Sequence, residues 1–362
     1  MTNGNGTTPV YYASHPVIRI DGEVREGLGD ILLISLLVEE TRAGLYRCEA
    51  RFTNWMPMAE QPFPFFDQEL VDFGKALAVE LGPPEGARQV FNGRITAIEA
   101  HYPQQQPPEL TLLAEDRLQD LRLERRTRTF EDVGDADVVN QIAAQHGLTA
   151  AVDADGPTYP VLTQLNQSDL AFLRERAAAI DAEVWVEDRT LHFQAHNGRS
   201  AGDVQLTYGG NLLQFSVLAD LAHQRSSVKV SGWNVGDKSA IDVSAGQSAI
   251  SGELNGDRSG GAVLAAALAE RHERIVTAVP LSNDEAQAMA DARYRERARR
   301  FLTGSGIADG TPALRVGTVV EISEVGSLFN GRYIATAVRH TFDRIHGYRT
   351  TFEVERPGIG GR

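Results

Sequence analysis

The sequence has only one cysteine, Cys48, among 362 residues, and it has no long apolar run. A single cysteine excludes an intrachain disulfide framework and a zinc site built on several thiolates. The longest apolar stretch, Ile31 to Val38, is interrupted by Ser35. It falls far short of the ~20 residues that a membrane-spanning helix needs. We therefore expect no membrane insertion by the chain itself.

The start of the sequence lacks a recognisable targeting segment. Its first nine residues are rich in Gly, Asn and Thr, and they have neither the basic cluster nor the apolar run of a secretory signal. We expect residues 1–14 to be a flexible amino terminus and the protein to fold in the cytoplasm.

Positive charge is scarce in the first part of the chain, and the formal net charge is −14. Residues 1–116 hold 17 acids and 8 bases, residues 117–200 hold 14 and 9, and residues 201–362 hold 18 of each. A protein that binds nucleic acid through its phosphates needs a basic face, so this distribution argues against a nucleic-acid partner. It fits a soluble protein that meets basic partners or lines a charged channel.

The first third of the chain contains a series of short strand patterns with almost no helix. These patterns lie at residues 16–20, 31–40, 45–54, 77–81, 90–99 and 110–114. Gly93, inside the fifth of them, predicts a β-bulge. Five or six short strands separated by turns predict a closed or nearly closed antiparallel barrel over residues 15–116.

The pattern changes over residues 117–200, where helical periodicity appears. Asp135 is a good N-cap before an apolar stripe, and a second amphipathic helix begins near Asn166 or Ser168. A hairpin over residues 183–194 follows. We interpret this part as a small α/β insert domain.

Strand patterning returns in residues 201–358, which we predict to form a second β-barrel domain. A Gly/Ser/Asp-rich stretch over residues 236–261 predicts a mobile loop. A helix is predicted over residues 283–303, because Ser282 and Glu285 form a capping box and arginines crowd its end. The expected fold class is α+β, mainly β, with two tube-like antiparallel β-barrel domains and a small α/β insert between them.

Histidine and cysteine do not form a catalytic or metal-binding pattern. His192 and His196 have the spacing of metal ligands on a helix, but here they fall in a strand and a turn, where i and i+4 side chains do not converge. Cys48 has no base near it in the sequence and alternates within a strand. We therefore interpret it as a small buried hydrophobic residue.

Adjacent carboxylates occur twice, at Glu39-Glu40 and at Glu115-Asp116. Adjacent strand residues point to opposite faces of a sheet, so neither pair can flank one glycosidic bond by itself. We predict no catalytic, cofactor-binding or metal-binding residues, no cofactor and no enzymatic activity.

Two further segments have alternative interpretations. Gly256–Gly261 is glycine-rich and precedes a helix-like run, but it lacks the Gly-Lys-Ser/Thr of a phosphate loop, which favours a flexible connector. The aromatic run Phe63–Phe66 contains prolines and is accompanied by Phe73. It predicts either a small core beneath a loop or an exposed apolar docking patch, and the first is favoured.

Three stretches, in sequence order, carry a specific resemblance. They are FEDVGDADVVNQIAAQHGL at 130–148, LNQSDLAFLRER at 165–176 with the hairpin at 184–193, and PALRVGTVV at 312–320 with the segments at 329–342 and 347–354. Together they resemble the phage late control gene D family, which supplies the central baseplate hub of contractile phage tails. That family is similar to the hub part of VgrG-type spike proteins of contractile injection systems. The resemblance covers roughly residues 15–356.

The resemblance implies a structural protein that forms a homotrimer. Each chain would contribute two tube-like barrels, so that the ring adapts a hexameric inner tube to a trimeric spike. VgrG-type chains continue into an OB-fold and a β-helical needle, whereas this sequence ends at Arg362. The implied partners are therefore a separate spike protein, the inner tube protein and other baseplate subunits.

The resemblance also implies a location, namely assembly in the cytoplasm followed by incorporation into a phage tail or an extracellular injection particle. Two other functions stay open at this point. One is a tail-tip peptidoglycan hydrolase, and the other is a stand-alone carbohydrate-binding β-barrel protein.

Overall fold

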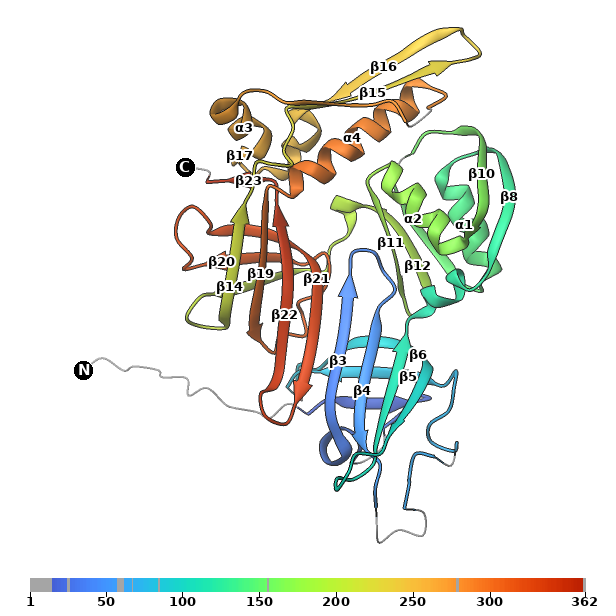
Figure 1. Cartoon of the computed structure of the whole chain (residues 1–362), viewed down its shortest axis with the longest axis vertical. Helices are drawn as coiled ribbons and strands as arrows, with labels where there is room; N and C mark the ends of the chain where they lie inside the picture. Colours follow the sequence, from blue (N-terminus) through green and yellow to red (C-terminus); the bar gives the residue numbers. More distant parts are fainter. Residues whose placement is uncertain are drawn as a thin grey trace, which may run out of the picture.

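The computed structural model describes residues 15–24, 27–56, 62–66, 68–83, 85–154, 156–277 and 280–360. The segment 1–14, expected to be flexible, lies outside the described residues. Most strands belong to one large, mainly antiparallel sheet, and helices cluster beside it (Figure 1). This confirms the α+β, mainly β fold class. No helix in the described ranges is long and apolar enough to cross a membrane.

The large sheet contains strands from both ends of the chain. In spatial order they are β14 (Leu212–Ala219), β19 (Leu302–Asp309), β22 (Gly347–Arg356), β21 (Gly331–Asp343), β3 (Leu33–Thr41), β4 (Arg47–Thr53), β7 (Glu109–Glu115), β6 (Arg88–His101), β5 (Ala76–Leu81), β1 (Val17–Ile20) and β2 (Glu23–Val24). A branch adds β20 (Val319–Ser323), which pairs with β21, and β13 (Asp203–Thr207), which pairs with β20 in parallel.

The strands of residues 15–116 (the first half) and those of residues 201–360 (the second half) are joined more closely than the sequence indicated. β3 of the first half pairs with β21 of the second in antiparallel register, from Ser35 opposite Asp343 to Thr41 opposite Ala337. Each half nevertheless has its own core, one around Phe52 and one around Phe352. Among the described residues, the pairing path runs openly from β14 to β2.

Alternation explains the strands of the first half. In β4, Cys48, Ala50 and Phe52 are buried while Glu49 and Arg51 are exposed, which matches the two faces of a pleated strand. A single π-helical turn, η1 (Leu28–Leu32), leads into β3. The inward side chains form the first core.

Gly93 lies where β6 changes its partner from β5 to β7. A Cβ there would meet the carbonyl oxygen of Glu115 at 2.3 Å and the ring of Phe91 at 2.6 Å. The register irregularity against β7 falls between Ile95 and Ala97. The expected bulge at Gly93 is therefore wrong in its place, and this glycine permits close packing instead.

Residues 117–200 contain the two expected helices and the expected hairpin. The elements are η2 (Arg117–Arg122), β8 (Arg125–Val133), α1 (Asp135–Gln145), β9 (Thr149–Asp153), β10 (Tyr159–Ser168), α2 (Asp169–Ala179), β11 (Ala182–Glu187), β12 (Thr190–Ala195) and η3 (His196–Gly198). β9 adds to the β11–β12 hairpin in parallel, and β8 pairs with β10. Apolar residues of both helices and the hairpin form a separate core.

Part of the second half leaves the large sheet and forms a unit that the sequence did not predict. β15 (Ser227–Asn234), β16 (Ser239–Ala245) and β18 (His272–Ile275) make a three-stranded sheet, and α4 (Asn283–Arg299) packs on it. The shared core includes Val230 and Ile241 from the sheet and Ala290 and Tyr294 from α4. The helix ends before the predicted residue 303, because β19 already begins at Leu302.

The predicted loop over residues 236–261 is wrong. This stretch contains β16, η4 (Gln247–Glu253), β17 (Arg258–Ser259) and the start of α3 (Gly260–Leu268). β17 pairs with β23 (Gly358–Ile359). The many small residues of this stretch indicated a loop, but two of its apolar residues, Ile241 and Ile250, are buried in the core beneath α4.

Candidate functional site

The histidines singled out in the sequence do not form a metal site. His192 lies on β12 and stacks on Trp185, with ring centroids 4.7 Å apart. His196 begins η3, and its Nδ1 lies 2.6 Å from Oε1 of Glu183. Among the described residues, no group of three or more His, Cys, Asp or Glu could hold a metal ion.

Glu39 and Glu40 diverge, as strand geometry predicted. Glu39 contacts Arg339 and Arg47, both at 2.5 Å. Glu40 points into the protein, where it contacts Arg315 and accepts a hydrogen bond from the Val316 backbone at 3.3 Å. Burial raises the pKa of Glu40 against these favourable contacts. Each acid is thus neutralised by its own basic partner.

Glu115 and Asp116 diverge in the same way. Glu115 accepts a hydrogen bond from Arg122 at 2.5 Å. Asp116 is buried, and its oxygens accept the backbone N–H groups of Tyr46 at 2.7 Å and Leu118 at 2.8 Å. Burial raises the pKa of Asp116 to about 7, although both hydrogen bonds oppose that shift. Asp116 caps η2 and anchors it to the start of β4, which is a structural role.

The glycine-rich segment at 256–261 is packed, so the prediction of a flexible connector is wrong. Ser259 caps α3 by accepting the N–H of Ala262 at 3.1 Å. A Cβ on Gly260 would meet Oε1 of Gln224 at 2.4 Å, and one on Gly261 would meet the carbonyl oxygen of Arg225 at 2.9 Å. Protein atoms occupy the space beside these two glycines, whereas in a phosphate loop the corresponding space holds a phosphate group.

Cys48 and the aromatic run take the positions that their patterns favoured. Cys48 is 1 % exposed in the first core, and burial raises the pKa of its thiol. Phe65 lies in the same core, 5.7 Å from the ring of Phe52. Phe73 differs, because it is 63 % exposed. Cys48 is therefore confirmed as a buried hydrophobic residue, and the aromatic run is in part core and in part surface.

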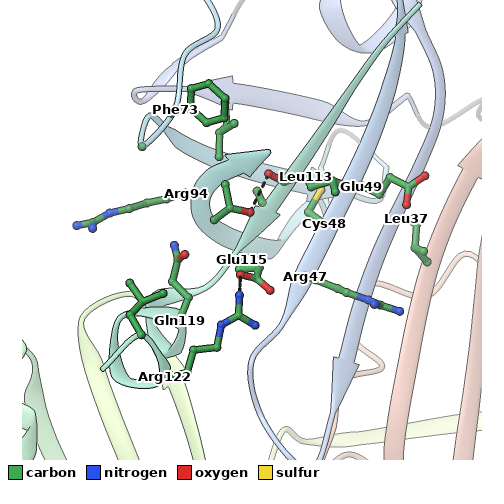
Figure 2. A pocket seen from close by; sticks show the side chains of 15 residues that line it. Leu37, Arg47, Cys48, Glu49, Phe73, Arg94, Leu113, Glu115, Gln119 and Arg122 are labelled. Carbon is green, nitrogen blue, oxygen red and sulfur yellow. Dashed lines mark hydrogen bonds and ion pairs between the residues drawn. The ribbon is translucent and has the colours of Figure 1, made fainter. Parts of the chain in front are cut away.

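Phe73 lines a groove of about 760 Å³ on the first half of the chain (Figure 2). The groove lies along β3, β4, β6, β7 and the turn after η2, and its walls mix exposed apolar side chains with charges of both signs. Its labelled lining residues are Leu37, Arg47, Cys48, Glu49, Phe73, Arg94, Leu113, Glu115, Gln119 and Arg122.

A buried ionic cluster lies where the three parts of the chain meet, and we call it the junction cluster (Arg42, Glu183, His196, Arg199 and Glu355). Arg42 follows β3, and its Nε lies 2.9 Å from Oε1 of Glu183. It also donates to Glu355 of β22. Arg199 donates to the second oxygen of Glu183 at 2.8 Å. Arg42 thus bridges the first half, the β11 strand and the second half.

Electrostatics keep Glu183 ionised. Burial alone would raise its pKa, but the hydrogen bond with His196 and the charges of His196, Arg199 and Arg42 lower it to about 2. The guanidinium of Arg199 also lies 4.3 Å from the ring centroid of Trp185. A carboxylate held so firmly in its charged form cannot act as a general acid near neutral pH. The junction cluster is therefore suited to fastening segments together.

A second ionic link fastens α4 to the α2–β11 turn. Arg299 is 3 % exposed, and it donates to both oxygens of Asp181 at 2.5 and 2.7 Å. It also donates to both oxygens of Glu253 at 2.8 and 2.6 Å. Bidentate pairs of this kind fix geometry as well as charge.

Of the junction cluster, only His196 could be singled out from the sequence, and none of its partners could. Arg42 and Glu355 are separated by 313 positions, so no local spacing connects them. A weak signal did exist, because Glu183 immediately precedes the apolar run Val184–Val186 of β11. A charge at an inward strand position requires a buried partner.

Comparison with solved structures shows what this fold is similar to. The 43 kDa tail protein of prophage MuSo2 from Shewanella oneidensis superposes with a TM-score of 0.69 and 13 % identity, over 95 % of this chain and 98 % of that one. A tail protein from Neisseria meningitidis gives 0.65 and 13 %, over 96 % and 98 %. An Escherichia coli component of the type VI secretion system gives 0.58 and 12 %, over 94 % and 76 %.

These likenesses confirm, at the level of the fold, the predicted resemblance to phage tail and VgrG-type proteins. A chain in a PdpA–VgrG complex gives a TM-score of 0.55 at 10 % identity, over 97 % of this chain and 66 % of that one. No significant match is found among curated protein sequences.

A family model gives the assignment by sequence. The model described as the Alg8 N-terminal domain matches residues 55–344, which contain β5 to β7 of the first half, the α/β part and most of the second half. Because this family model matches most of the chain, the chain belongs to the Alg8 N-terminal domain family.

Proposed function

We propose that this protein is a structural hub subunit of the baseplate of a contractile injection particle or phage tail. Three copies form a ring that adapts a hexameric inner tube to a trimeric spike. The observation that carries the proposal is the likeness to two bacterial tail proteins, which extends over at least 95 % of this chain and 98 % of theirs.

The interior supports a mechanical role rather than a catalytic one. The acids that could have formed a hydrolytic pair, Glu39, Glu40, Glu115 and Asp116, are held by basic side chains or backbone N–H groups. The junction cluster and the Arg299 link fasten parts of the chain that are far apart in sequence. A subunit that transmits force between tube and spike benefits from such fixed joints. In this proposal the hub assembles inside the cell and then becomes part of the particle.

Native mass spectrometry of the purified protein tests the ring. The expected species contains three chains of 39.5 kDa each. Mixing with the inner tube and spike proteins of the same particle should give complexes that retain three hub chains. A chain that stays monomeric at every soluble concentration and binds neither protein contradicts the proposal. Release of soluble fragments from purified peptidoglycan would favour the hydrolase instead.

A further inference from the structure

Asp116 differs from the other buried carboxylates among the described residues. Those groups are each ion-paired with an arginine, and they are Glu39, Glu40, Asp135, Asp169, Glu183 and Glu355. Asp116 is 3 % exposed, and in the described chain its two oxygens accept only the backbone N–H groups of Tyr46 and Leu118. Because a buried charge is stable only when an opposite charge compensates it, this exception requires an explanation.

Asp116 lies at the joint between the first half and the α/β part. β7 ends at Glu115 and η2 begins at Arg117, so the chain passes from one part to the other at this residue. The backbone N–H of Asp116 also donates to the carbonyl oxygen of Tyr46 at 3.0 Å. Asp116 borders a cavity of about 240 Å³ that Arg315 of the second half also lines. The cavity brings solvent close to the carboxyl group.

Arg174 on α2 is a cation near Asp116 that no acid in the described chain holds. The other arginines around the joint are engaged with acids of their own, Arg117 with Asp120, Arg122 with Glu115, and Arg315 with Glu40. Arg174 instead donates to the carbonyl oxygen of Gly44 at 3.4 Å, and its buried Nε has no hydrogen-bond partner among the described residues. The charge of Arg174 acts on Asp116, but the two groups form no ion pair in this arrangement. An uncompensated acid and an uncompensated cation therefore lie close together at the joint.

The protonation state of Asp116 changes near neutral pH. Burial raises its pKa to about 7, and the charge of Glu115 adds to the rise, whereas the two N–H groups and Arg174 oppose it. The Tyr46 hydroxyl stays protonated, because burial raises its pKa as well. The charged side chains that face the same cavity are Glu187, Asp188 and Arg315. Neutral and ionised Asp116 thus coexist near pH 7, and the ionised form attracts Arg174 more strongly.

We propose that Asp116 and Arg174 form a proton-operated latch between the first half and the α/β part. With Asp116 neutral, Arg174 stays on the carbonyl group of Gly44, as in this structure. With Asp116 ionised, the guanidinium of Arg174 moves to the carboxylate and forms the missing ion pair. Because Arg174 belongs to α2, this change moves the point at which α2 is fastened to the first half. The latch lies within one chain, so it does not depend on the proposed ring.

A double-mutant cycle at two pH values tests the latch. The variants Asp116→Asn, Arg174→Gln and their combination are unfolded with denaturant at one chain concentration, on either side of pH 7. At about pH 8.5, the effect of the double substitution on the unfolding constant should differ from the product of the single effects by about tenfold or more. At about pH 5.5 this difference should stay below about threefold, because Asp116 is then neutral.

Asp120→Asn combined with Arg174→Gln is the matched control, because Asp120 lies on the same η2 turn but pairs with Arg117. This pair of substitutions should show no coupling at either pH. Equal coupling of Asp116 and Arg174 at both pH values would show a permanent ion pair, and no coupling at either would show that the two groups do not meet. Either result overturns the latch.

The wild-type protein provides a second measurement that does not depend on how the variants fold. NMR of the arginine Nε–H groups follows Arg174 directly, and its signal is assigned through its contacts with neighbouring protons. The signal should move with a midpoint near pH 7, as the guanidinium exchanges Gly44 for Asp116. A signal that stays constant through this range overturns the latch and leaves the hub proposal standing.

Discussion

At the scale of single residues, the interior charges are matched locally. Asp169 accepts from Arg128 at 2.7 Å and from Gln164 at 2.9 Å, and it lies 2.8 Å from Nε2 of His146. Asp135 forms a similar buried pair with Arg176 at 2.7 Å. Buried charges persist when they are paired and hydrogen-bonded, so these groups stabilise the fold without offering a reactive site.

His340 predicts an acid-sensitive step in stability. It is fully buried on β21, and its Nδ1 lies 2.9 Å from the hydroxyl of Tyr348. Burial, aided by the charge of Arg315, lowers its pKa from 6.5 to about 3. Between pH 3 and 6.5 the unfolded chain therefore binds a proton at this histidine that the folded chain does not bind. The stability is complete above pH about 6.5 and declines as the pH falls towards 3.

Chemical denaturation at several pH values measures this effect. Between pH 6 and 4, the variant His340→Gln should show a slope of unfolding free energy against pH that is smaller by about 1.4 kcal/mol per pH unit. His101→Gln, at an exposed position of β6, is the matched control. An identical slope in the wild type and in His340→Gln would show that His340 is not the group responsible.

Removing one arginine from the junction cluster should strongly lower the free energy of unfolding. Arg199→Leu removes the partner of Glu183 at 2.8 Å and should lower the free energy of unfolding by about 3–5 kcal/mol. The control Arg349→Leu removes an ion pair with Asp309, whose side chains are 37 % and 54 % exposed. It should cost less than about 1 kcal/mol. Equal losses of unfolding free energy from the two substitutions would show that the junction cluster stabilises the fold no more than an exposed ion pair does.

At the scale of elements, regular alternation was the reliable signal. β4 follows it, with Cys48, Ala50 and Phe52 inward, and was predicted within two residues at either end. β8 was missed because Arg125–Val133 has few apolar residues and is largely exposed. β16 was missed because serine and glycine around it indicated a loop. Its order depends on Ile241 packing against α4, a tertiary contact that no local pattern reveals.

Gly260 offers a test of the segment that resembled a flexible connector. Alanine usually improves a helix by about 1 kcal/mol relative to glycine. At Gly260 the added Cβ would meet Gln224 at 2.4 Å and the ring of Phe301 at 2.7 Å, so Gly260→Ala should destabilise by about 1–3 kcal/mol.

Gly252→Ala is the matched control, because a Cβ on Gly252 of η4 meets nothing within 4 Å. Thermal unfolding of both variants compares the two positions. An unchanged or raised melting temperature for Gly260→Ala would mean that the segment is loosely packed and could admit a ligand after all.

At the scale of the whole molecule, long-range joints define the architecture. The pairing of β3 with β21 and the junction cluster connect residues about 300 positions apart, so the sequence could predict the two halves but not how they are joined. That the chain has no catalytic residues stays a prediction from the sequence.

Electron cryomicroscopy of intact particles assembled with this protein tests the central claim most directly. We expect three copies of the chain in a ring on the particle axis, between the inner tube and the spike. Particles that form with a normal tube and spike but contain no density for this chain at that position would contradict it.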